Sequence, residues 1–566
     1  MYARPTVVDS MRLVAGSLLV SLTLAARADV TGTVRNAEGT PVPGAVVSLP
    51  ERPEIARTST DAQGGFRLAS PPPGSHRITA ALPFDLDDAR RYRIAVASVN
   101  VGPGGNGQID LSLADVPASD NQTYLPIKAE PPGGCGDCHG EKLTQWRASM
   151  HAMAALDSWV LDLYDGSGTP GTGGNGYVYT ATHDPGSSGT CAVCHAPTAN
   201  PRDPAVVSLS AVTSASALEG VTCTACHQLA AVDGEVDALH LLGGARVFFP
   251  GVDGSSSTHD YVWGPLPDSA APFMETMHAP WISDSRFCAS CHEYKNPSTS
   301  APGQRTYSEW LASAYAQPGP GFRSCQDCHM PQASAAGTIA DANRVGALQR
   351  PGEQIHQHGF AADASGNLAQ ALGLTVQVSA GAGLARVDVS LSNQGLGHAF
   401  PTGIGLRNAL VVVRVRRNGV SLARSAGPVL PWWADDDVPG TQAGDLAGQP
   451  GLGLAKVLAG RINGQGTVVR PVLFVDAETV DEDSTLAPGA SRAGRFDFLL
   501  GTATAGDTLE VEVEILYRRA WRSVAVAKGW TTRIDGKPWE ERVRLHTSQL
   551  VLDTTAVDGI HANGFE

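Results

Sequence analysis

Alternating apolar and polar residues mark both ends of this chain, whereas its middle shows short helical patterns between loops. Residues 30–49 alternate around a turn at Gly39–Pro43, and residues 58–82 add two short strand patterns. After about residue 370, six runs rich in valine, leucine and phenylalanine are separated by glycine-rich loops, which is typical of an antiparallel sandwich. The pattern predicts a β-sandwich at each end of a loop-rich region with short helices.

The middle region contains a short internal sequence repeat. Apolar residues recur at helical spacing between residues 141 and 164, which predicts a helix there. Within it, "TQWRASMHA" at 144–152 is echoed by "SEWLASAYA" at 308–316. Trp146 and Trp310 match, and His151 matches Tyr315. We expect a repeated packing unit in which the second copy carries a packing tyrosine in place of a histidine.

The N-terminal residues 1–28 are predicted to be an export signal. Arg12 precedes an apolar run at 13–25, and a small-residue pattern follows at 26–28. The run is too short to span a bilayer, and no later apolar stretch is long enough to do so. No cysteine lies near the expected cleavage point, which argues against a lipid anchor. We expect an exported protein that lies either in the periplasm or outside the cell, at the cell surface.

The length of the chain bears on its number of domains, and its charge bears on the kinds of partner that it can bind. A chain of 566 residues is long enough for several domains. The formal charge of -15 and the lack of a lysine or arginine block argue against nucleic acid and anionic membranes as partners. The expected divisions are a signal peptide at 1–28, a β-sandwich at 29–115, a linker at 116–130, a region at 131–368 that contains all ten cysteines, a second β-sandwich at 369–556 and a tail at 557–566.

All ten cysteines form pairs that are each followed by histidine. In chain order the pairs are Cys135 and Cys138, Cys191 and Cys194, Cys223 and Cys226, Cys288 and Cys291, and Cys325 and Cys328. C-x-x-C-H is the attachment motif of c-type haem, in which the thiols form thioethers and the histidine binds the iron. Structural zinc sites and redox dithiols do not require a histidine after every pair. The motifs, numbered first to fifth in this order, predict five covalently bound haem c groups.

The proximal iron ligands follow directly from the motifs. They are His139, His195, His227, His292 and His329. Haem iron is the only metal expected. Haem is attached after export, so this chemistry agrees with the predicted compartment.

The sixth ligand of each iron separates electron carriers from catalysts, because two histidines close the iron and an open position admits small molecules. The distal candidates are His151, His278, His358 and His398, followed by His183, His240, His259 and His356. His398 lies on a connection between two predicted strands. The histidines at 76, 546 and 561 lie in segments that look unrelated to haem, and we expect them at the surface.

Residues from about 125 to 420 resemble multihaem cytochromes c related to the tetrahaem cytochrome of ammonia oxidation and, more distantly, to hydroxylamine oxidoreductase and the pentahaem nitrite reductases. The matching segments are "CGDCHGEKLTQWRASMHA", "GVTCTACH", "MHAPWISDSRFCASCHEYKNP", "RTYSEWLASAYA", "SCQDCHMP" and "GHAFPTG". The resemblance implies bis-histidine ligation from residues such as His151, His278, His358 and His398, with closely stacked haems.

Two departures from these relatives bear on function. The chain has no C-x-x-C-K motif, which carries the lysine-ligated catalytic haem of those nitrite reductases, and it has fewer motifs than hydroxylamine oxidoreductases. We therefore predict an electron carrier between redox protein partners, with no catalytic residue assigned. Two alternatives stay open: an oxidoreductase acting on a small nitrogen or sulfur compound at an open haem, and a structural subunit of a homo-oligomeric or surface cytochrome assembly.

The N-terminal β region also resembles a known module. It is similar to the carboxypeptidase-regulatory-like, transthyretin-type sandwich. The matching positions are Gly32, Gly39, Gly44, Ala45, Thr60, Asp61, Gly64 and Phe66. The resemblance implies a noncatalytic role in placement, docking or stabilisation.

Overall fold

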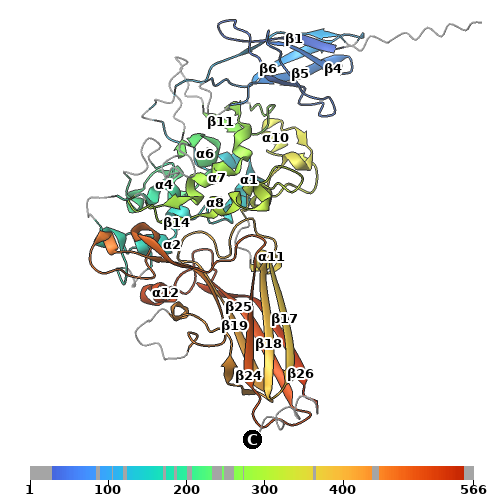
Figure 1. Cartoon of the computed structure of the whole chain (residues 1–566). Coiled ribbons are helices and arrows are strands. Elements are labelled where there is room, and N and C mark those ends of the chain that lie inside the picture. The colour runs from blue at the N-terminus through green and yellow to red at the C-terminus, as the bar shows by residue number, and fades with distance from the viewer. Residues whose placement is uncertain are drawn as a thin grey trace, which may run out of the picture. The chain divides into compact units, whose positions relative to one another are not determined.

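The structure is a computed structural model of the chain (Figure 1). It describes residues 29–69, 71–84, 90–104, 106–118, 121, 124–169, 174–183, 188–199, 207–232, 245–247, 260–271, 273–296, 298–360, 365–435 and 445–553. The expected signal peptide and the tail lie outside these residues. The chain divides into two compact units, residues 1–80 with 96–112, and residues 81–95 with 113–566.

The first unit is built from two small sheets. One contains β1 (Asp29–Asn36), β4 (Gly65–Ala69), β7 (Gly107–Gln108) and β8 (Leu111–Leu113), and the other contains β2 (Val46–Ser48), β3 (Thr58–Ser59), β5 (Gly74–Ala81) and β6 (Ala95–Val101). Alternation buries Val30 and Val34 of β1, while Val47 and Ile78 of the other sheet are also buried. The predicted turn is present, and Gly39 adopts a φ of 81° that favours glycine. The prediction of a β-rich N-terminal region is confirmed.

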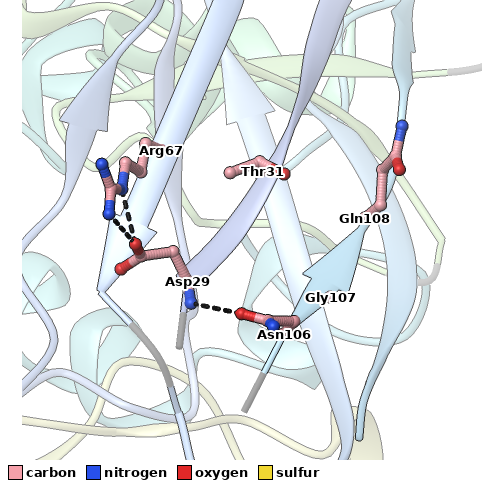
Figure 2. Close-up of a pocket in the computed structure, with 6 residues that line it drawn as sticks. All are labelled: Asp29, Thr31, Arg67, Asn106, Gly107 and Gln108. Carbon is pink, nitrogen blue, oxygen red and sulfur yellow. Dashed lines mark hydrogen bonds and ion pairs between the residues drawn. The ribbon is translucent and has the colours of Figure 1, made fainter. Parts of the chain in front are cut away.

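The first unit has a polar pocket at the edge of β1 (Figure 2). Arg67 forms an ion pair with Asp29, and the backbone N–H of Asp29 donates to Asn106 Oδ1 at 3.3 Å. Thr31, Gly107 and Gln108 complete the lining. None of these residues is a candidate haem ligand.

Residues 81–84 and 90–95, which the sequence pattern assigns to the N-terminal sandwich, pack within the second unit. The N–H of Ile94 donates to the carbonyl of Thr276 at 2.8 Å, next to His278. Phe84 packs edge-on against Trp263 and Trp281, with ring centroids 6.0 and 5.9 Å apart. This segment therefore belongs to the core beside β11 (Tyr261–Gly264) and β12 (Glu275–His278).

The centre of the second unit consists of short helices, as predicted (Figure 1). They are α1 (Gly140–Arg147), α2 (Ser158–Tyr164), α3 (Tyr179–Thr182), α4 (Cys191–His195), α5 (Ala215–Leu218), α6 (Cys223–His227), α7 (Ser285–His292), α8 (Thr306–Leu311), α9 (Cys325–His329) and α10 (Ala342–Val345). Short strand pairs connect them: β9 (Leu229–Val232) with β10 (Ala245–Val247), β11 with β12, β13 (Tyr294–Lys295) with β14 (Pro302–Gln304), and β15 (Gly337–Thr338) with β16 (Gln349–Arg350). Among the described residues, no helix has the length and apolar character needed to cross a membrane.

The predicted helix over 141–164 is wrong as a single element. It is divided into α1, a 3-10 turn at Ala154–Leu156, and α2. The Ser149 hydroxyl donates to the carbonyl of Trp146 at 2.7 Å just after α1 ends. Asp157 caps α2 by accepting from the N–H of Trp159 at 3.0 Å. Local side-chain hydrogen bonds therefore interrupt the helical spacing, and His151 lies in the turn after α1.

The C-terminal part forms two antiparallel sheets, which confirms the predicted β-rich region. One contains β17 (Leu372–Gly381), β18 (Leu384–Asn393), β24 (Ser491–Leu499) and β21 (Arg424–Ala426). The other contains β23 (Thr479–Asp483), β22 (Gly451–Ala459), β19 (Asn408–Arg417), β25 (Thr508–Arg518), β26 (Glu540–Val551) and β20 (Val420–Ser421). Val389 and Phe496 of one sheet and Val411 and Val513 of the other share a hydrophobic cluster. α11 (Ser365–Ala371) precedes these sheets, and α12 (Arg522–Lys528) follows β25.

The C-terminal sheets are joined to the helical region by buried contacts near α12. Trp530 stacks on Trp159 of α2 with ring centroids 4.6 Å apart, and its indole N–H donates to Asp162 at 2.8 Å. The Lys528 ammonium donates to the carbonyl of Asp162 at 2.8 Å. Loops of the C-terminal sheets can therefore place side chains among the cysteine motifs.

Candidate haem sites

Each cysteine motif coincides with a single turn of helix. The motifs form α4, α6 and α9, the end of α7, and a 3-10 turn at Cys135–Asp137. Side chains three and four positions apart lie on one face of a helix. The turn therefore brings both thiols together and places the following histidine beside them, as attachment of one haem requires.

Four of the proximal histidines have a fixed ring orientation. The Nδ1 atoms of three of them hydrogen-bond to backbone carbonyls: His139 to Ile339 at 2.8 Å, His195 to Ala154 at 3.0 Å and His227 to Trp263 at 2.7 Å. The Nδ1 atom of His292 lies 3.2 Å from the side-chain amide of Gln304. Metal-binding histidines use one ring nitrogen for such a contact and the other for the metal. Nε2 is thus the nitrogen available to iron.

Three proximal rings face another histidine ring. The pairs are His227 with His358, at 6.3 Å between centroids and 20° between planes; His329 with His398, at 6.3 Å and 8°; and His151 with His292, at 6.2 Å and 67°. Three of the four leading distal candidates therefore lie opposite a proximal histidine.

The separation of the rings fits a metal between them. An imidazole nitrogen binds a metal ion at about 2 Å. Two such bonds, plus the depth of each ring from nitrogen to centroid, account for the observed 6.2–6.3 Å. The Nδ1 atoms of His358 and His398 hydrogen-bond to the carbonyls of His356 and Ala399, both at 3.0 Å, which again directs Nε2 inward. The residues present thus fit haem iron.

Burial keeps these imidazoles neutral, which is the form that binds metals. It lowers the pKa of His151 to about 4 and that of His292 to about 3. It also lowers the pKa of His329 to about 4 and that of His358 to about 3. A zinc cage fits less well, because the described residues contain no group of three or more histidine, cysteine, aspartate or glutamate side chains arranged to hold a metal ion.

The other candidate histidines have different surroundings. His278 is 7% exposed at the end of β12, and its assignment to an iron stays a prediction. The Nδ1 atom of His356 hydrogen-bonds to the carbonyl of Met330 at 2.8 Å. In contrast, Nε2 of His183 contacts Asp476 at 2.9 Å. The candidates His240 and His259, and the expected surface residue His561, lie outside the described residues.

The echoed segments occupy equivalent places beside two different motifs. The indole N–H of Trp146 donates to the carbonyl of Val221 at 2.8 Å, two residues before the third motif. The indole N–H of Trp310 donates to the carbonyl of Arg323 at 2.9 Å, two residues before the fifth motif. Trp146 thus connects α1 to the backbone just before the third motif, and Trp310 connects α8 to the backbone just before the fifth motif.

His151 and Tyr315, which differ between the two copies of the repeat, also make equivalent backbone hydrogen bonds. The N–H of Val221 donates to the carbonyl of His151, and that of Arg323 donates to the carbonyl of Tyr315, both at 2.9 Å. Tyr315 therefore occupies the backbone position of His151.

The segments that carry two distal candidates also bind to equivalent helix positions. Gln145 accepts from the N–H of His358 at 2.8 Å, and Glu309 accepts from the N–H of Ala399 at 3.2 Å. These segments read "HGF" and "HAF" in the sequence. This shared pattern of histidine, a small residue and phenylalanine is a second sequence likeness, separate from the repeat at 144–152 and 308–316.

Contacts between thiols give the order of the motifs in space. The thiol of Cys135 lies near that of Cys223, Cys288 near Cys325, Cys194 near Cys291, and Cys226 near Cys291. The first, third, fourth and fifth motifs therefore form a row, and the second motif branches from the fourth. No local feature of the sequence indicates this order.

Comparison with known proteins agrees with the motifs. Residues 29–114 match the carboxypeptidase regulatory-like domain, residues 134–228 match the family of cytochrome c554 and c-prime, and residues 270–349 match the N-terminal region of the NapC/NirT cytochrome c family. The two cytochrome matches together include all five motifs and imply covalently bound haem c. No curated protein matches the chain.

One solved structure with a similar fold is a penta-haem cytochrome c552 from Thermochromatium tepidum. It has 20% sequence identity and a TM-score of 0.51, and the match covers 74% of this chain and 97% of that chain. At this identity the likeness concerns the fold. The predicted relation to hydroxylamine oxidoreductase stays a prediction.

Proposed function

We propose that this protein is an exported pentahaem c-type cytochrome that transfers electrons between redox protein partners. The observation that carries the proposal is the facing of three proximal histidines by a second imidazole. Haem c, when bound, supplies one-electron couples whose potentials depend on axial ligands, burial and nearby charge. The matches to two cytochrome c families support the same conclusion.

The chain's own residues perform two tasks in this proposal. The cysteines would hold each haem covalently, and each pair of facing histidines would supply two imidazole ligands to one iron. Because closed bis-histidine iron suits electron transfer, the motifs at His227, His292 and His329 are assigned to conduction.

The ends of the row are the proposed places of exchange with partners. His139 of the first motif is exposed, and Cys328 of the fifth motif is the exposed cysteine. Between them, Ala225 and Ala289 of the third and fourth motifs are 6% and 0% exposed. An enclosed row with accessible ends suits passage of electrons through the protein rather than into solvent along its length.

The C-terminal sheets, which we propose form a β-sandwich, supply the distal ligand of the fifth motif through His398. The contact of Ala399 with Glu309 and a 2.6 Å hydrogen bond from the Thr402 hydroxyl to the same carboxylate hold this loop beside α8. The carboxypeptidase-regulatory-like region is assigned a placement or docking role.

The test is a haem count joined to electron paramagnetic resonance of the purified, fully loaded protein. The proposal expects five haems per chain by the pyridine haemochrome assay and at least three low-spin ferric signals. A count clearly below five, or high-spin iron at the fifth motif, would overturn it.

A further inference from the structure

We propose that the fourth motif, which ends at His292, holds the haem of highest reduction potential among the three facing pairs, and that Arg407 is a residue that raises this potential. The inference rests on the proposed electron-transfer function and identifies the motif at which an electron stays longest. The step is a one-electron exchange with a redox protein partner, in which ferric iron becomes ferrous iron and no bond is made or broken.

The position of the fourth motif among the others gives the first argument. The thiol of Cys291 lies near those of Cys226 and Cys194, which belong to the third and second motifs. The thiol of Cys288 lies near that of Cys325 in the fifth motif. By these contacts the fourth motif has three neighbours. An electron held there can therefore leave in any of three directions.

The distal histidines of the three pairs differ in the hydrogen bond of their outer nitrogen. The Nδ1 atoms of His358 and His398 each hydrogen-bond to a backbone carbonyl at 3.0 Å. The Nδ1 atom of His151 is buried and has no hydrogen-bond partner among the described residues, and Phe360 packs edge-on against its ring at 4.3 Å between centroids. A histidine that donates its outer N–H is a more basic ligand, and a more basic ligand stabilises ferric iron. The less basic His151 therefore favours ferrous iron at the fourth motif.

Arg407 adds a positive charge at the same motif. Its Nη1 atom lies 3.4 Å from the carbonyl of Thr402, on the loop between β18 and β19, and its guanidinium interacts electrostatically with His292. The side chain is half-buried, and no acidic residue that the structure describes pairs with it. Glu309 lines the same small cavity, but its carboxylate accepts from the ammonium of Lys456 at 3.2 Å. An unpaired cation disfavours the extra positive charge of ferric iron, so it raises the potential.

The charge of Arg407 is opposed at the fifth motif. His398 interacts electrostatically with Arg407 and also with the carboxylate of Glu309, and these charges have opposite signs. For His292 the interacting groups are Arg407 and three histidines, which burial keeps neutral. The two charges near His398 offset each other, so the net effect of Arg407 is larger at the fourth motif than at the fifth.

A cation also lies beside the third motif, but there both imidazoles hydrogen-bond to carbonyls. Lys142 interacts electrostatically with His358, and its ammonium lies 3.7 Å from the carboxylate of Glu141. The Nδ1 atom of His227 hydrogen-bonds to the carbonyl of Trp263 at 2.7 Å, and His358 has its own carbonyl partner. Two basic ligands and a cation paired with a carboxylate place the potential of the third motif below that of the fourth.

The experiment is a reductive titration of the fully loaded protein, followed by electron paramagnetic resonance. The signal of the fourth motif is the one that His151→Ala removes, and in the wild type it should disappear first among the signals of the three pairs. In Arg407→Gln, with five haems retained, the equilibrium constant for reduction of this motif should fall about tenfold, which is about 59 mV for one electron. Arg407→Lys keeps the charge and should keep most of the wild-type potential.

The matched control is Arg414→Gln. Arg414 is an arginine of β19 whose guanidinium donates to Glu512 at 2.9 Å. Because its charge is already paired with a carboxylate, its removal should leave the potential of the fourth motif at the wild-type value.

Two sets of outcomes would overturn the inference. Reduction of the third or fifth motif before the fourth in the wild type would contradict the order, and this reading does not depend on the folding of any variant. An unchanged potential in Arg407→Gln, a larger fall at the fifth motif than at the fourth, or equal falls in the glutamine and lysine variants would contradict the role of Arg407. Five haems with the wrong order would leave the electron-transfer function standing, whereas a wild type with fewer than five haems would overturn both proposals.

Discussion

His329 and His398 face each other with ring centroids 6.3 Å apart and planes within 8°. His329 ends a cysteine motif, and His398 lies on a loop between β18 and β19 of the C-terminal sheets. The amide of Asn393 donates to the carbonyl of His398 at 2.9 Å, which holds the loop in place. This pair of rings is thus one of the contacts between the helical region and the C-terminal sheets.

Replacing His398 with alanine should convert one low-spin haem to high spin, because the iron at the fifth motif loses its sixth ligand. The measurement is electron paramagnetic resonance of the oxidised protein at equal haem content. His76→Ala, in the N-terminal unit, is the control and should leave every signal unchanged. An unaltered spectrum in His398→Ala would remove this residue from the ligand set.

The angle between facing rings should distinguish the low-spin haems. The planes of His151 and His292 are 67° apart, whereas the other two pairs are within 20°. Ring orientation sets the splitting of the iron orbitals, so we expect the fourth motif to give a low-spin signal distinct from those of the third and fifth. His151→Ala should remove that signal alone. If His151→Ala instead removes a signal of the type given by the third and fifth motifs, the assignment of His151 to the fourth motif is wrong.

The indole hydrogen bonds of the repeat should contribute to stability. Trp146→Phe and Trp310→Phe each remove a donor to a backbone carbonyl and leave that acceptor unsatisfied, which costs about 1–3 kcal/mol. Unfolding by guanidinium, followed by tryptophan fluorescence and circular dichroism, measures the change. Trp432→Phe is the control, since the indole N–H of Trp432 makes no hydrogen bond to any residue that the structure describes. Equal losses in all three variants would contradict the proposed role of these bonds.

Lys528 should make stability depend on alkaline pH. Its side chain is fully buried and donates to the carbonyl of Asp162, and burial lowers its pKa. The folded state then binds fewer protons than the unfolded state between the lowered pKa and the ordinary value of 10.5. Since stability rises with pH where the unfolded state binds more protons, the wild type should gain stability relative to Lys528→Met as the pH rises from 7 to 10. Unfolding midpoints of both proteins at each pH test the sign, and a constant difference would contradict it.

The sequence by itself determined the haem attachment sites and the β-rich regions that flank them. Attachment depends on residues three and four positions apart, such as Cys223, Cys226 and His227, and a single helical turn is enough to bring these together. Strand alternation is equally local, as in β18, where every second residue is buried. Both patterns depend on residues that are close together in the sequence, so they can be recognised without the tertiary structure.

Only the tertiary structure decided which histidines meet. His151 and His183 both lie in short segments after a helix, yet one faces His292 and the other is held by Asp476. No local pattern separates them, because the partner comes from a distant part of the chain in each case. The order of the motifs has the same origin: the contact between Cys194 and Cys291 depends on how the loops between them fold, and loop length and composition do not encode it.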